Sequence, residues 1–360
     1  MPETDGKDLA APGPKLTIKD VARQLGVSTA TVSNAFNRPD QLSERLRQRI
    51  LGECQRIGYA GPSAAARNLR TGRSGIVGVV LAESLRYSFI DPVASQFLAG
   101  VSEVLDQRHC NMLLFSALEM DASSKHRLQE SMVDGYIVYG FSGKGRTYQR
   151  LLQQPKRVVV VDLKMGDYTS VNVDNYSGAR RSAEHALAHN PEHVSILGLK
   201  LLATDRVCRV RDNELYDEAS SVAVSRLRGY LDAVQASGRM LSAERIWNVP
   251  ENSHTLAYQA AREALLSAPR PTLLLCASDT IAIAALRAAL QLGIQVPQML
   301  HIVGFDGIPE ASILHPTLTT VSQQSEEKGR LAARILLGEI EDKDILLPTE
   351  LVIGESCPTL

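Results

Sequence analysis

The chain has 360 residues, which is too many for one compact core, so we expect two or three domains. No uninterrupted apolar run is long enough to span a bilayer, so no membrane partner is expected. The five cysteines are scattered and include no CxxC pair that would indicate zinc or redox chemistry. An odd, scattered set suits a reducing cytosol. Composition therefore favours a cytoplasmic protein with no cofactor and no metal.

Positive charge is concentrated near the N-terminus, although the whole chain has a net charge of only −1. Between Lys15 and Arg73, eleven Lys and Arg residues stand against four Asp and Glu residues, which leaves this segment at +7 and the remainder at −8. Such an asymmetry indicates that the N-terminal segment is the part that binds a polyanion.

The first elements along the chain are two short helices joined by a tight turn. Residues 1–14 show no periodic apolar pattern and predict a disordered tail. Within residues 16–37, Thr17 can cap a first helix, Gly26 can end it in the left-handed conformation, and Ser28 can cap a second helix. This spacing predicts a helix-turn-helix, with an ordinary helical hairpin as the alternative, and the local positive charge favours the former.

The predicted second helix leaves one face with small, mostly polar side chains. Such a helix can lie in the major groove of DNA while its N-terminal amides meet a phosphate. We expect Thr29, Ala30 and Asn34 to face base edges, with Ala30 offering only a methyl contact. The residues expected to position the DNA backbone are Thr17, Ser28, Thr31, Ser33 and Asn37, with Arg45 as a further candidate.

Two consecutive stretches resemble a known protein family. The first is LTIKDVARQLGVSTATVSNAFN (16–37), and the second is LSERLRQRILGECQRIGYAGPSAAARNLRTGRSGIVGVVL (42–81), in which Ser43 can cap a third helix. In this order they resemble the DNA-binding headpiece, hinge helix and first core strand of the lactose and galactose repressor family of bacterial transcription regulators. The resemblance implies a headpiece over residues 15–61, and a hinge helix and linker over residues 62–74.

The resemblance also implies how the hinge acts. In that family a leucine at the place of Leu69, from each subunit of a homodimer, wedges into the minor groove at the centre of a pseudo-palindromic operator of double-stranded DNA and kinks it. The stretch 63–69 is too short to be a stable helix in water, so it should fold only against DNA and its twin. Residues 59–69 are one residue longer than in the best-known members, which leaves the hinge register open.

From residue 76 onward, short apolar strands alternate with helical stretches, which is typical of parallel sheets covered by helices on both faces. The resemblance implies an α/β core of two doubly wound lobes, as in periplasmic binding proteins, over residues 75–340. It places the first lobe at about 75–175 with a return near 321–337, and residues 341–360 as a C-terminal tail packed on the core. The predicted strands are Ile76–Leu81, Asn111–Ser116, 136–139, 157–162, Val194–Leu199, Ile246–Val249, Leu273–Cys276 and 301–305.

Polar residues at strand ends are candidates for a small-molecule site, because ligands bind at the carboxyl ends of parallel strands. The stretch TLLLCASDTIAIAALRAALQLGIQVPQMLHIVGFDGIPEASILHPTLTTVSQ (272–323) resembles the family's most recognisable core stretch. Residues that match effector ligands of the family by motif position are Asp162, Arg226, Ser278 and Asp306; Asp279 also follows the strand, with capping of the next helix as its alternative role. Carboxylates and a guanidinium can bind vicinal hydroxyls in pairs, which implies a sugar or related metabolite as effector.

Other features leave the effector open. Tyr87 and Phe89 are candidates for stacking on a ligand ring, with loop packing as the alternative. Gly307 stands where the family commonly has an acidic residue, and Gly354 where an arginine is usual. A charged insertion over residues 200–219 could be a lid, a partner surface or a solvated loop.

The alternative function is a two-lobed binding protein or enzyme without a DNA role. The sequence has no GxSxG elbow, no complete phosphate loop and no GxGxxG that opens a helix after a strand. His185 and His189 lie one helical turn apart and could bind a metal, but Glu184 precedes the pair, unlike in a zincin, and helical His pairs are usually packed or solvated. The sequence therefore predicts a cytoplasmic, nucleoid-associated, effector-controlled transcription regulator, a repressor rather than an enzyme.

Overall fold

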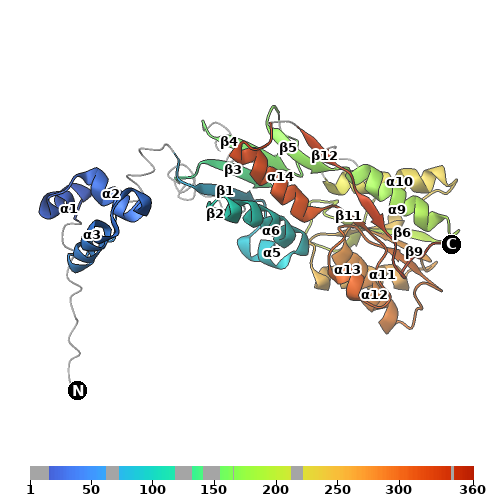
Figure 1. Ribbon diagram of the computed structural model, residues 1–360. Coiled ribbons are helices and arrows are strands. Elements are labelled where there is room, and N and C mark those ends of the chain that lie inside the picture. Colours follow the sequence, from blue (N-terminus) through green and yellow to red (C-terminus); the bar gives the residue numbers. More distant parts are fainter. Residues whose placement is uncertain are drawn as a thin grey trace, which may run out of the picture. The chain divides into compact units, whose positions relative to one another are not determined.

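The structure is a computed structural model that describes residues 16–61, 73–117, 132–140, 155–164, 166–211, 222–341 and 344–360 (Figure 1). The chain separates into two compact units, Met1–Ser74 and Gly75–Leu360. The predicted hinge helix with Leu69 lies outside the described residues. None of the described helices is long and apolar enough to cross a membrane.

Within residues 16–61, three α-helices and one short 3-10 turn enclose a small core. The buried side chains of this core come from all three helices and include Val21, Val32 and Ile50. Ser43 caps the third helix, as predicted, because its Oγ accepts a hydrogen bond from the Leu46 amide. The elements are α1 Ile18–Leu25, α2 Thr29–Asn37, η1 Pro39–Gln41 and α3 Glu44–Arg56.

The turn between α1 and α2 follows the capping residues predicted from the sequence. Thr17 and Asp20 form a reciprocal capping box, in which the Thr17 amide donates to Asp20 Oδ2 at 3.0 Å. Gly26 ends α1 with a φ of 64°, a conformation that favours glycine. Ser28 Oγ then accepts a hydrogen bond from the Thr31 amide at 3.0 Å and starts α2. The local sequence therefore sets the relative direction of the two helices.

The second unit has two lobes, and the first contains a parallel sheet with strand order β12-β5-β4-β3-β1-β2. Helix α14 belongs to this lobe although it comes late in the chain, and Figure 1 shows it beside α6. The strands are β1 Ile76–Leu81, β2 Asn111–Ser116, β3 Gly135–Tyr139, β4 Arg157–Val161, β5 Thr169–Val173 and β12 Ile345–Leu347. The described helices of the lobe are α5 Leu85–Ile90, α6 Pro92–Gln107 and α14 Ser325–Leu337.

The second lobe contains a sheet of strand order β10-β9-β6-β8-β7, parallel except at its β7 edge. Helices α9 and α10 contribute to the core on one face of this sheet, and α11 and α12 to the core on the other. The strands are β6 Val194–Leu199, β7 Cys208–Arg209, β8 Ile246–Val249, β9 Leu273–Cys276 and β10 His301–Val303. The helices are α9 Asn175–Leu187, α10 Val222–Ala236, η2 Ala243–Arg245, α11 His254–Leu266, α12 Asp279–Gln291 and α13 Glu310–Ile313.

All eight predicted strands are present, with ends that differ by at most two residues. The sequence analysis missed β5, β7 and β12, and also the antiparallel pair β11 Thr320–Ser322 and β13 Glu350–Val352. These strands are short, and all except β12 carry polar residues, so they lack a long apolar run. The expected return to the first lobe is present as α14, and β12 extends the same sheet. Residues 344–360 thus supply β12 to the sheet of the first lobe and β13 to the antiparallel pair with β11.

Close packing of α14 on α6 depends on two glycines that face each other across the helix pair. A Cβ at Gly100 would lie 2.0 Å from the Glu326 carbonyl oxygen, and a Cβ at Gly329 would lie 2.2 Å from the Phe97 carbonyl oxygen. Both contacts are with backbone, which cannot move aside like a flexible side chain. The glycines therefore let the two helix backbones approach closely.

Candidate DNA-binding and ligand-binding sites

The outer face of α2 presents the side chains predicted to meet DNA. Thr29, Ala30 and Asn37 are exposed, and Ser33 and Asn34 are half-buried, whereas Val32 and Ala35 on the opposite face are buried. Thr17, Ser28 and Arg45 are also exposed, and Thr31 is half-buried. The face is therefore free of any packing role that would hide it from a partner.

Two asparagines of this face already hold hydrogen bonds within the headpiece. Asn34 Nδ2 donates to Gln41 Oε1 at 3.1 Å, and Asn37 Nδ2 donates to the Ser33 carbonyl at 3.0 Å. The bond of Asn34 joins α2 to the following turn. Arg47, in contrast, points inward, and its Nε donates to the Ala35 carbonyl at 3.3 Å.

In the core, the structure brings two predicted ligand residues into direct contact. Arg226 Nη1 donates to Asp306 Oδ1 at 2.8 Å, and both side chains are almost fully buried. Arg226 also donates to Asn175 Oδ1 at 2.9 Å and to the Ala277 carbonyl at 2.7 Å. Its guanidinium lies 3.7 Å from the centroid of the Phe305 ring. A buried guanidinium with this many partners is held in one orientation.

A chain of hydrogen bonds continues from this pair to the first lobe. Gln323 Nε2 donates to Asp306 Oδ1 at 2.7 Å, while Gln323 Oε1 accepts from Lys328 Nζ at 2.8 Å. Lys328 Nζ, which is fully buried, also donates to Asp162 Oδ2 at 2.7 Å. Gln323 precedes α14 on a segment that links the lobes. The hydrogen bonds through this segment therefore connect Asp162, which follows β4 of the first lobe, to Asp306, which follows β10 of the second.

Asp162 and Asp306, the two carboxylates of this hydrogen-bonded network, each follow a strand and have an unusual backbone conformation. Asp162 has a φ of 56° and Asp306 a φ of 131°, which non-glycine residues rarely adopt. Such conformations cost free energy and persist where the surroundings impose them. Among the described residues, Asp162 Oδ1 is buried and has no hydrogen-bond partner. The site therefore holds an unused acceptor as well as two buried ion pairs.

A second polar chain links the lobes. Tyr87 Oη donates to Asp91 Oδ2 at 3.1 Å, Asn252 Nδ2 donates to the same oxygen at 3.0 Å, and Ser278 Oγ donates to Asn252 Oδ1 at 2.7 Å. These hydrogen bonds bring Tyr87 and Ser278 to the same inter-lobe region. Phe89 differs, because the residue is 63 % exposed.

Asp279 has a different role from helix capping. Ser278 is the N-cap of α12 and accepts a hydrogen bond from the Ile281 amide at 3.2 Å. The fully buried Asp279 instead accepts from Thr320 Oγ1 at 2.5 Å and from the Ile308 amide at 2.9 Å. It therefore ties the start of α12 to the segments that follow β10.

Burial changes the acid–base behaviour of the two carboxylates in the second lobe. It raises the pKa of Asp306 to about 7, although Arg226 opposes this shift. It also raises the pKa of Asp279 to about 6, against the hydrogen bonds from Thr320 and Ile308. The pKa of the Tyr87 phenol is raised as well, by burial and then by the charge of Asp91.

Two glycines that depart from the family pattern stand where a side chain has no room. Gly307 has a φ of 69°, and a Cβ there would lie 2.6 Å from Ser322 Cα. A Cβ at Gly354 would lie 2.6 Å from the Leu318 carbonyl carbon. Neither position can supply the charged group that is common in the family, so the effector must be recognised by other residues.

Part of the predicted insertion is ordered against both lobes. Cys208 and Arg209 form β7, which pairs with β8, and Lys200 forms an ion pair with Glu83 of the first lobe. Lys200 Nζ also lies 5.9 Å from the centroid of the Tyr87 ring. Residues 212–221 lie outside the described part of the chain. The described part of the insertion is therefore an edge strand and an inter-lobe contact.

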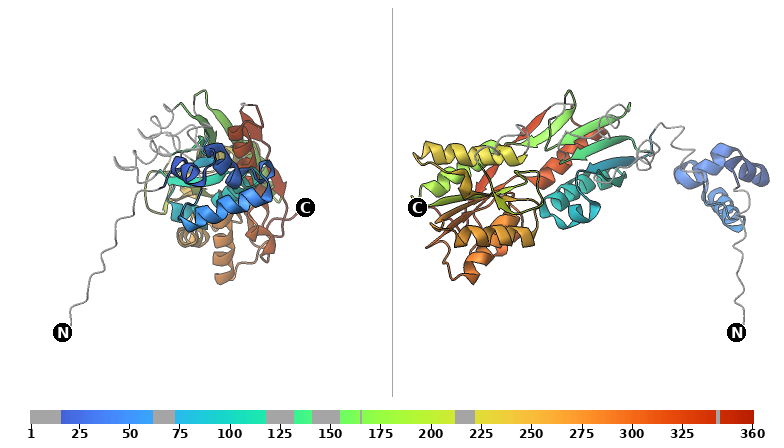
Figure 2. Two further views of the ribbon diagram at one scale, coloured as in Figure 1. Left: turned by 60° about the vertical axis from the view of Figure 1, so that its left-hand side comes forward. Right: turned by 180° about the vertical axis from the view of Figure 1, so that it is seen from behind.

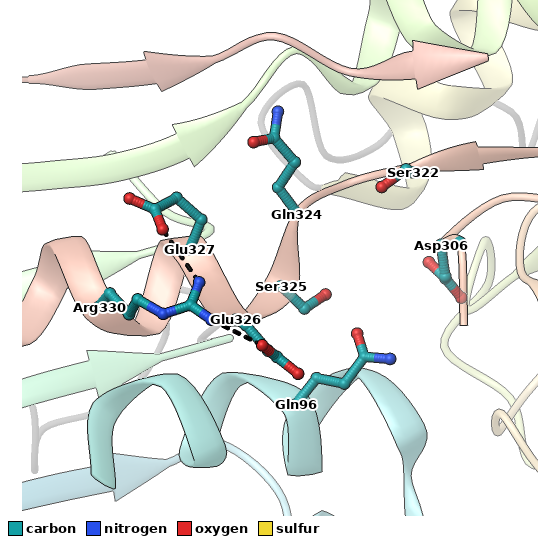
Figure 3. A pocket seen from close by; sticks show the side chains of 9 residues that line it. Gln96, Asp306, Ser322, Gln324, Ser325, Glu326, Glu327 and Arg330 are labelled. Atoms are coloured by element: carbon teal, nitrogen blue, oxygen red, sulfur yellow. Dashed lines mark hydrogen bonds and ion pairs between the residues drawn. The ribbon is translucent and has the colours of Figure 1, made fainter. Parts of the chain in front are cut away.

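A hollow of about 420 Å³ reaches Asp306 from beside α6 and the start of α14. Figure 3 shows Arg330 at its rim between two glutamates, with Nη2 2.7 Å from Glu326 Oε2 and Nη1 3.0 Å from Glu327 Oε2. Within the described residues, the buried Ser325 Oγ in its lining has no hydrogen-bond partner. Of the predicted ligand residues, only Asp306 lines this hollow.

Sequence reasoning missed several residues that complete the inter-lobe chains: Asn175, Gln323, Lys328, Asp91 and Asn252. One signal was present for Lys328, because it falls on the same face of α14 as the buried Ala332 and Ile335. A lysine on an apolar helix face needs a buried anionic partner. Its partner Asp162 is far away in the sequence, so no local pattern could identify it.

A capped helix-turn-helix joined to a two-lobed α/β core with a polar inter-lobe site defines a class of protein, the ligand-responsive DNA-binding regulators. Comparison with known proteins agrees. Residues 17–61 match the family described as "Bacterial regulatory proteins, lacI family", and residues 207–357 match "Periplasmic binding protein-like domain".

Relatives and solved structures extend this similarity over almost the whole chain. The HTH-type transcriptional regulator Rv3575c of Mycobacterium tuberculosis is 36% identical over 330 residues, which is 91% of this chain and 91% of the relative. The chain belongs to the LacI family and is a transcriptional regulator, with a DNA-binding domain and an effector-binding domain, rather than an enzyme.

Two solved structures share its fold. The lac repressor dimer bound to operator and the anti-inducer ONPF has a TM-score of 0.75 and 21% identity, and covers 96% of this chain and 100% of that chain. The transcriptional regulator CelR in complex with cellobiose has a TM-score of 0.66 and 23% identity, and the match covers 95% of this chain and 99% of that chain.

Proposed function

We propose that this regulator is a repressor that binds a pseudo-palindromic operator as a homodimer and is controlled by a sugar or related polyhydroxylated metabolite between the lobes. The observation that carries this proposal is the hydrogen-bonded chain from Asp162 through Lys328 and Gln323 to Asp306 and Arg226. These hydrogen bonds span both lobes through a linking segment. A ligand that competes for the same polar groups therefore acts on both lobes.

The DNA part of the proposal rests on the exposed face of α2. Thr29, Ala30 and Asn34 would meet base edges, while Thr17, Ser28, Thr31, Ser33, Asn37 and Arg45 would position the backbone. A single short headpiece covers only one half-site, so high affinity needs a second copy at a symmetric half-site. The lac repressor structure, a dimer on an operator, supports this arrangement. The site of action would be the nucleoid, where the operator lies.

The effector part rests on the chemistry of the inter-lobe groups. Asp162, Arg226, Asp306 and Ser278 offer charged and hydroxyl partners for vicinal hydroxyl groups, and Tyr87 borders the same region. Apart from the unused acceptor Asp162 Oδ1, these polar atoms are already hydrogen-bonded, so an effector must replace their bonds with its own at little net cost. A polyol can do so because each hydroxyl both donates and accepts. Cellobiose in the CelR structure is a ligand of this chemical class.

The exposed Phe89 would stack on a ligand ring only after the lobes close further around it. We propose that such closure reorients the first lobes of the dimer, because α14 carries Lys328 and packs on α6. That movement would form or melt the wedge at Leu69. The sign of the response depends on which core state binds the effector more tightly.

The experiment that tests the function is sequencing of genomic fragments retained by the purified chain at near-physiological salt. Recovery of one pseudo-palindrome with a constant centre is expected, and the neighbouring genes then define the sugars to test. The single tryptophan, Trp247, is buried in the second lobe, and its fluorescence can be used to test for their binding. Sequence-independent, salt-sensitive retention under all ligand conditions would contradict the proposal.

A further inference from the structure

A cluster of potential metal ligands lies in the second lobe outside the inter-lobe region. One ring nitrogen of His185, one ring nitrogen of His189 and Sγ of Cys357 all lie within 4.8 Å of one another. His185 lies in the last turn of α9, His189 lies in the turn two residues beyond the end of this helix, and Cys357 belongs to the C-terminal tail. Cys357 is fully buried, and the histidines are half-buried.

Hydrogen bonds to residues other than the two histidines also hold the tail in place. Ser356 Oγ donates to the Ile302 carbonyl at 2.6 Å and accepts from the Thr319 amide at 2.9 Å. Thr319 Oγ1 donates to the Cys357 carbonyl at 2.8 Å. The position of the thiol beside α9 is therefore built into the fold.

Hydrogen bonds also select the tautomer of both histidines. His185 Nε2 lies 2.9 Å from the Cys357 carbonyl oxygen, and His189 Nε2 lies 2.7 Å from the Pro358 carbonyl oxygen. A carbonyl oxygen only accepts, so each Nε2 carries the proton and each Nδ1 keeps its lone pair. Histidines that bind metals in proteins commonly donate the N–H of the other ring nitrogen to a backbone carbonyl. Nδ1 is therefore the atom through which each of these histidines would bind an ion.

We propose that His185, His189 and Cys357 form a binding site for a zinc-like transition-metal ion. Two imidazole nitrogens and one thiolate are ligands that zinc prefers, and a fourth tetrahedral position would be open to water. Bonds of roughly 2.0 to 2.3 Å to zinc require the three ligand atoms to move closer together by about 1 Å. Side-chain rotation supplies such a movement, since the two histidines are not fully buried.

The ring of His301 lies beside the proposed metal site. Its centroid lies 4.3 Å from that of His189 in an edge-to-face arrangement, so it packs against the proposed ligand. Figures 1 and 2 place the C-terminus at the end of the second lobe that faces away from the first lobe. A bound ion would therefore fasten the tail to α9 without occupying the inter-lobe site.

Titration of the full-length chain with Co²⁺ alone, followed by absorption spectroscopy, tests the site. We expect one equivalent per chain, with a thiolate-to-cobalt charge-transfer band and the strong visible bands of tetrahedral Co²⁺, and displacement of both by Zn²⁺. Cys357→Ser should abolish the charge-transfer band, and His189→Gln should weaken Zn²⁺ binding roughly 10-fold or more in a chelator competition. The matched controls Cys208→Ser and His254→Gln change the same residue types elsewhere in the lobe and should bind like the parent chain.

Several outcomes would overturn the site. The parent chain could show no charge-transfer band at saturating Co²⁺, a result that needs no variant to fold. Alternatively, the band could persist in Cys357→Ser or disappear in Cys208→Ser, which would place the metal elsewhere. Circular dichroism of each variant identifies loss of fold, and His189→Gln provides the second measurement if Cys357→Ser does not fold.

Discussion

Buried charges in the core are tolerated only where each has several partners. Lys328 has a carboxylate and an amide oxygen as acceptors, and Arg226 has a carboxylate, an amide oxygen and a backbone carbonyl. Removal of one partner from such a network costs several kcal/mol because it leaves the other charge buried and unpaired. The same groups that an effector would use are therefore also structural, which links ligand binding to the free energy of the folded state.

The buried acids of the second lobe predict a specific pH dependence of stability. Asp306 and Asp279 have pKa values of about 7 and about 6 in the folded chain, against an ordinary value near 4. Between about pH 4 and pH 7 the folded state thus holds protons that the unfolded state has lost. The free energy of unfolding should fall as pH rises through this range, and Asp306→Asn should make the decline shallower.

Urea unfolding from pH 4 to pH 7.5, followed by Trp247 fluorescence, measures this dependence. The matched control is Asp205→Asn, which changes an exposed aspartate of the same lobe and should keep the slope of the parent chain. An Asp306→Asn slope equal to that of the parent chain would contradict the assignment.

On the headpiece, Asn34 and Arg45 should differ in what they contribute to DNA binding. Asn34→Ala should relax base preference at one position in each half-site, because it removes an amide that can pair with a base edge, at a cost of about 1 to 3 kcal/mol. Arg45→Ala should weaken binding to all sequences alike and reduce the salt slope by about 1. Binding to a library of operator variants at several salt concentrations separates the two effects.

The free-state partner of Asn34 offers a control for that experiment. Gln41 accepts a hydrogen bond from Asn34 at 3.1 Å, and Gln41→Ala removes this bond while it leaves the amide available. We expect Gln41→Ala to keep the base preference of the parent chain. Equal losses on every sequence for Asn34→Ala would refute its role in base recognition.

At the scale of elements, the contact between α6 and α14 controls how the late part of the chain joins the first lobe. Gly100 and Gly329 let the helices approach at backbone distance. The close contact holds α14 so that Lys328 reaches Asp162. Packing of one helix pair thus positions a group that the inter-lobe site requires.

Substitution of Gly100 tests the importance of this contact. Gly100→Ala should lower the free energy of unfolding of the core by about 1 to 3 kcal/mol, because its Cβ would collide with the Glu326 carbonyl. The matched control is Gly52→Ala in α3, where a Cβ meets nothing within 4 Å and better helix propensity should stabilise the headpiece by up to about 1 kcal/mol. Thermal unfolding monitored by circular dichroism measures both. Unchanged stability of Gly100→Ala would show that the helices can separate without cost.

At the scale of the whole molecule, effector and operator should affect each other's binding equally. Both sites act on one equilibrium between core states, so the factor by which effector changes operator affinity must equal the factor by which operator changes effector affinity. A coupling of 1 to 3 kcal/mol would correspond to roughly 5- to 150-fold. In the proposed mechanism this coupling passes through the segment that contains Leu69.

Leu69→Ala tests that route. We expect weaker operator binding and a smaller DNA bend, because an alanine is too short to wedge between base pairs. Fluorescence anisotropy with an operator and gel mobility of permuted fragments measure affinity and bending. Unchanged affinity together with unchanged bending would eliminate the hinge mechanism and leave the headpiece assignment intact.

Features that depend on a few neighbouring residues were predictable. The caps Thr17, Ser28 and Ser43, the left-handed Gly26 and all eight apolar strands are confirmed. The polar strand β5 and the three-residue strand β12 were not, because pairing with a neighbouring strand, rather than a long apolar run, stabilises them. Local signals therefore identify the headpiece and most of the two sheets.

By itself, the sequence determined the helix-turn-helix and the apolar strands, since capping residues, helical spacing and apolar runs all act over short distances along the chain, whereas the two-lobed core was implied by resemblance to a family. Only the tertiary structure decided which polar groups meet. Lys328 is 166 residues from Asp162, and His185 is 172 residues from Cys357, yet each pair is in contact or close to it. The physical reason is that a buried charge or ligand needs a partner at a point in space, and packing of distant elements sets that point.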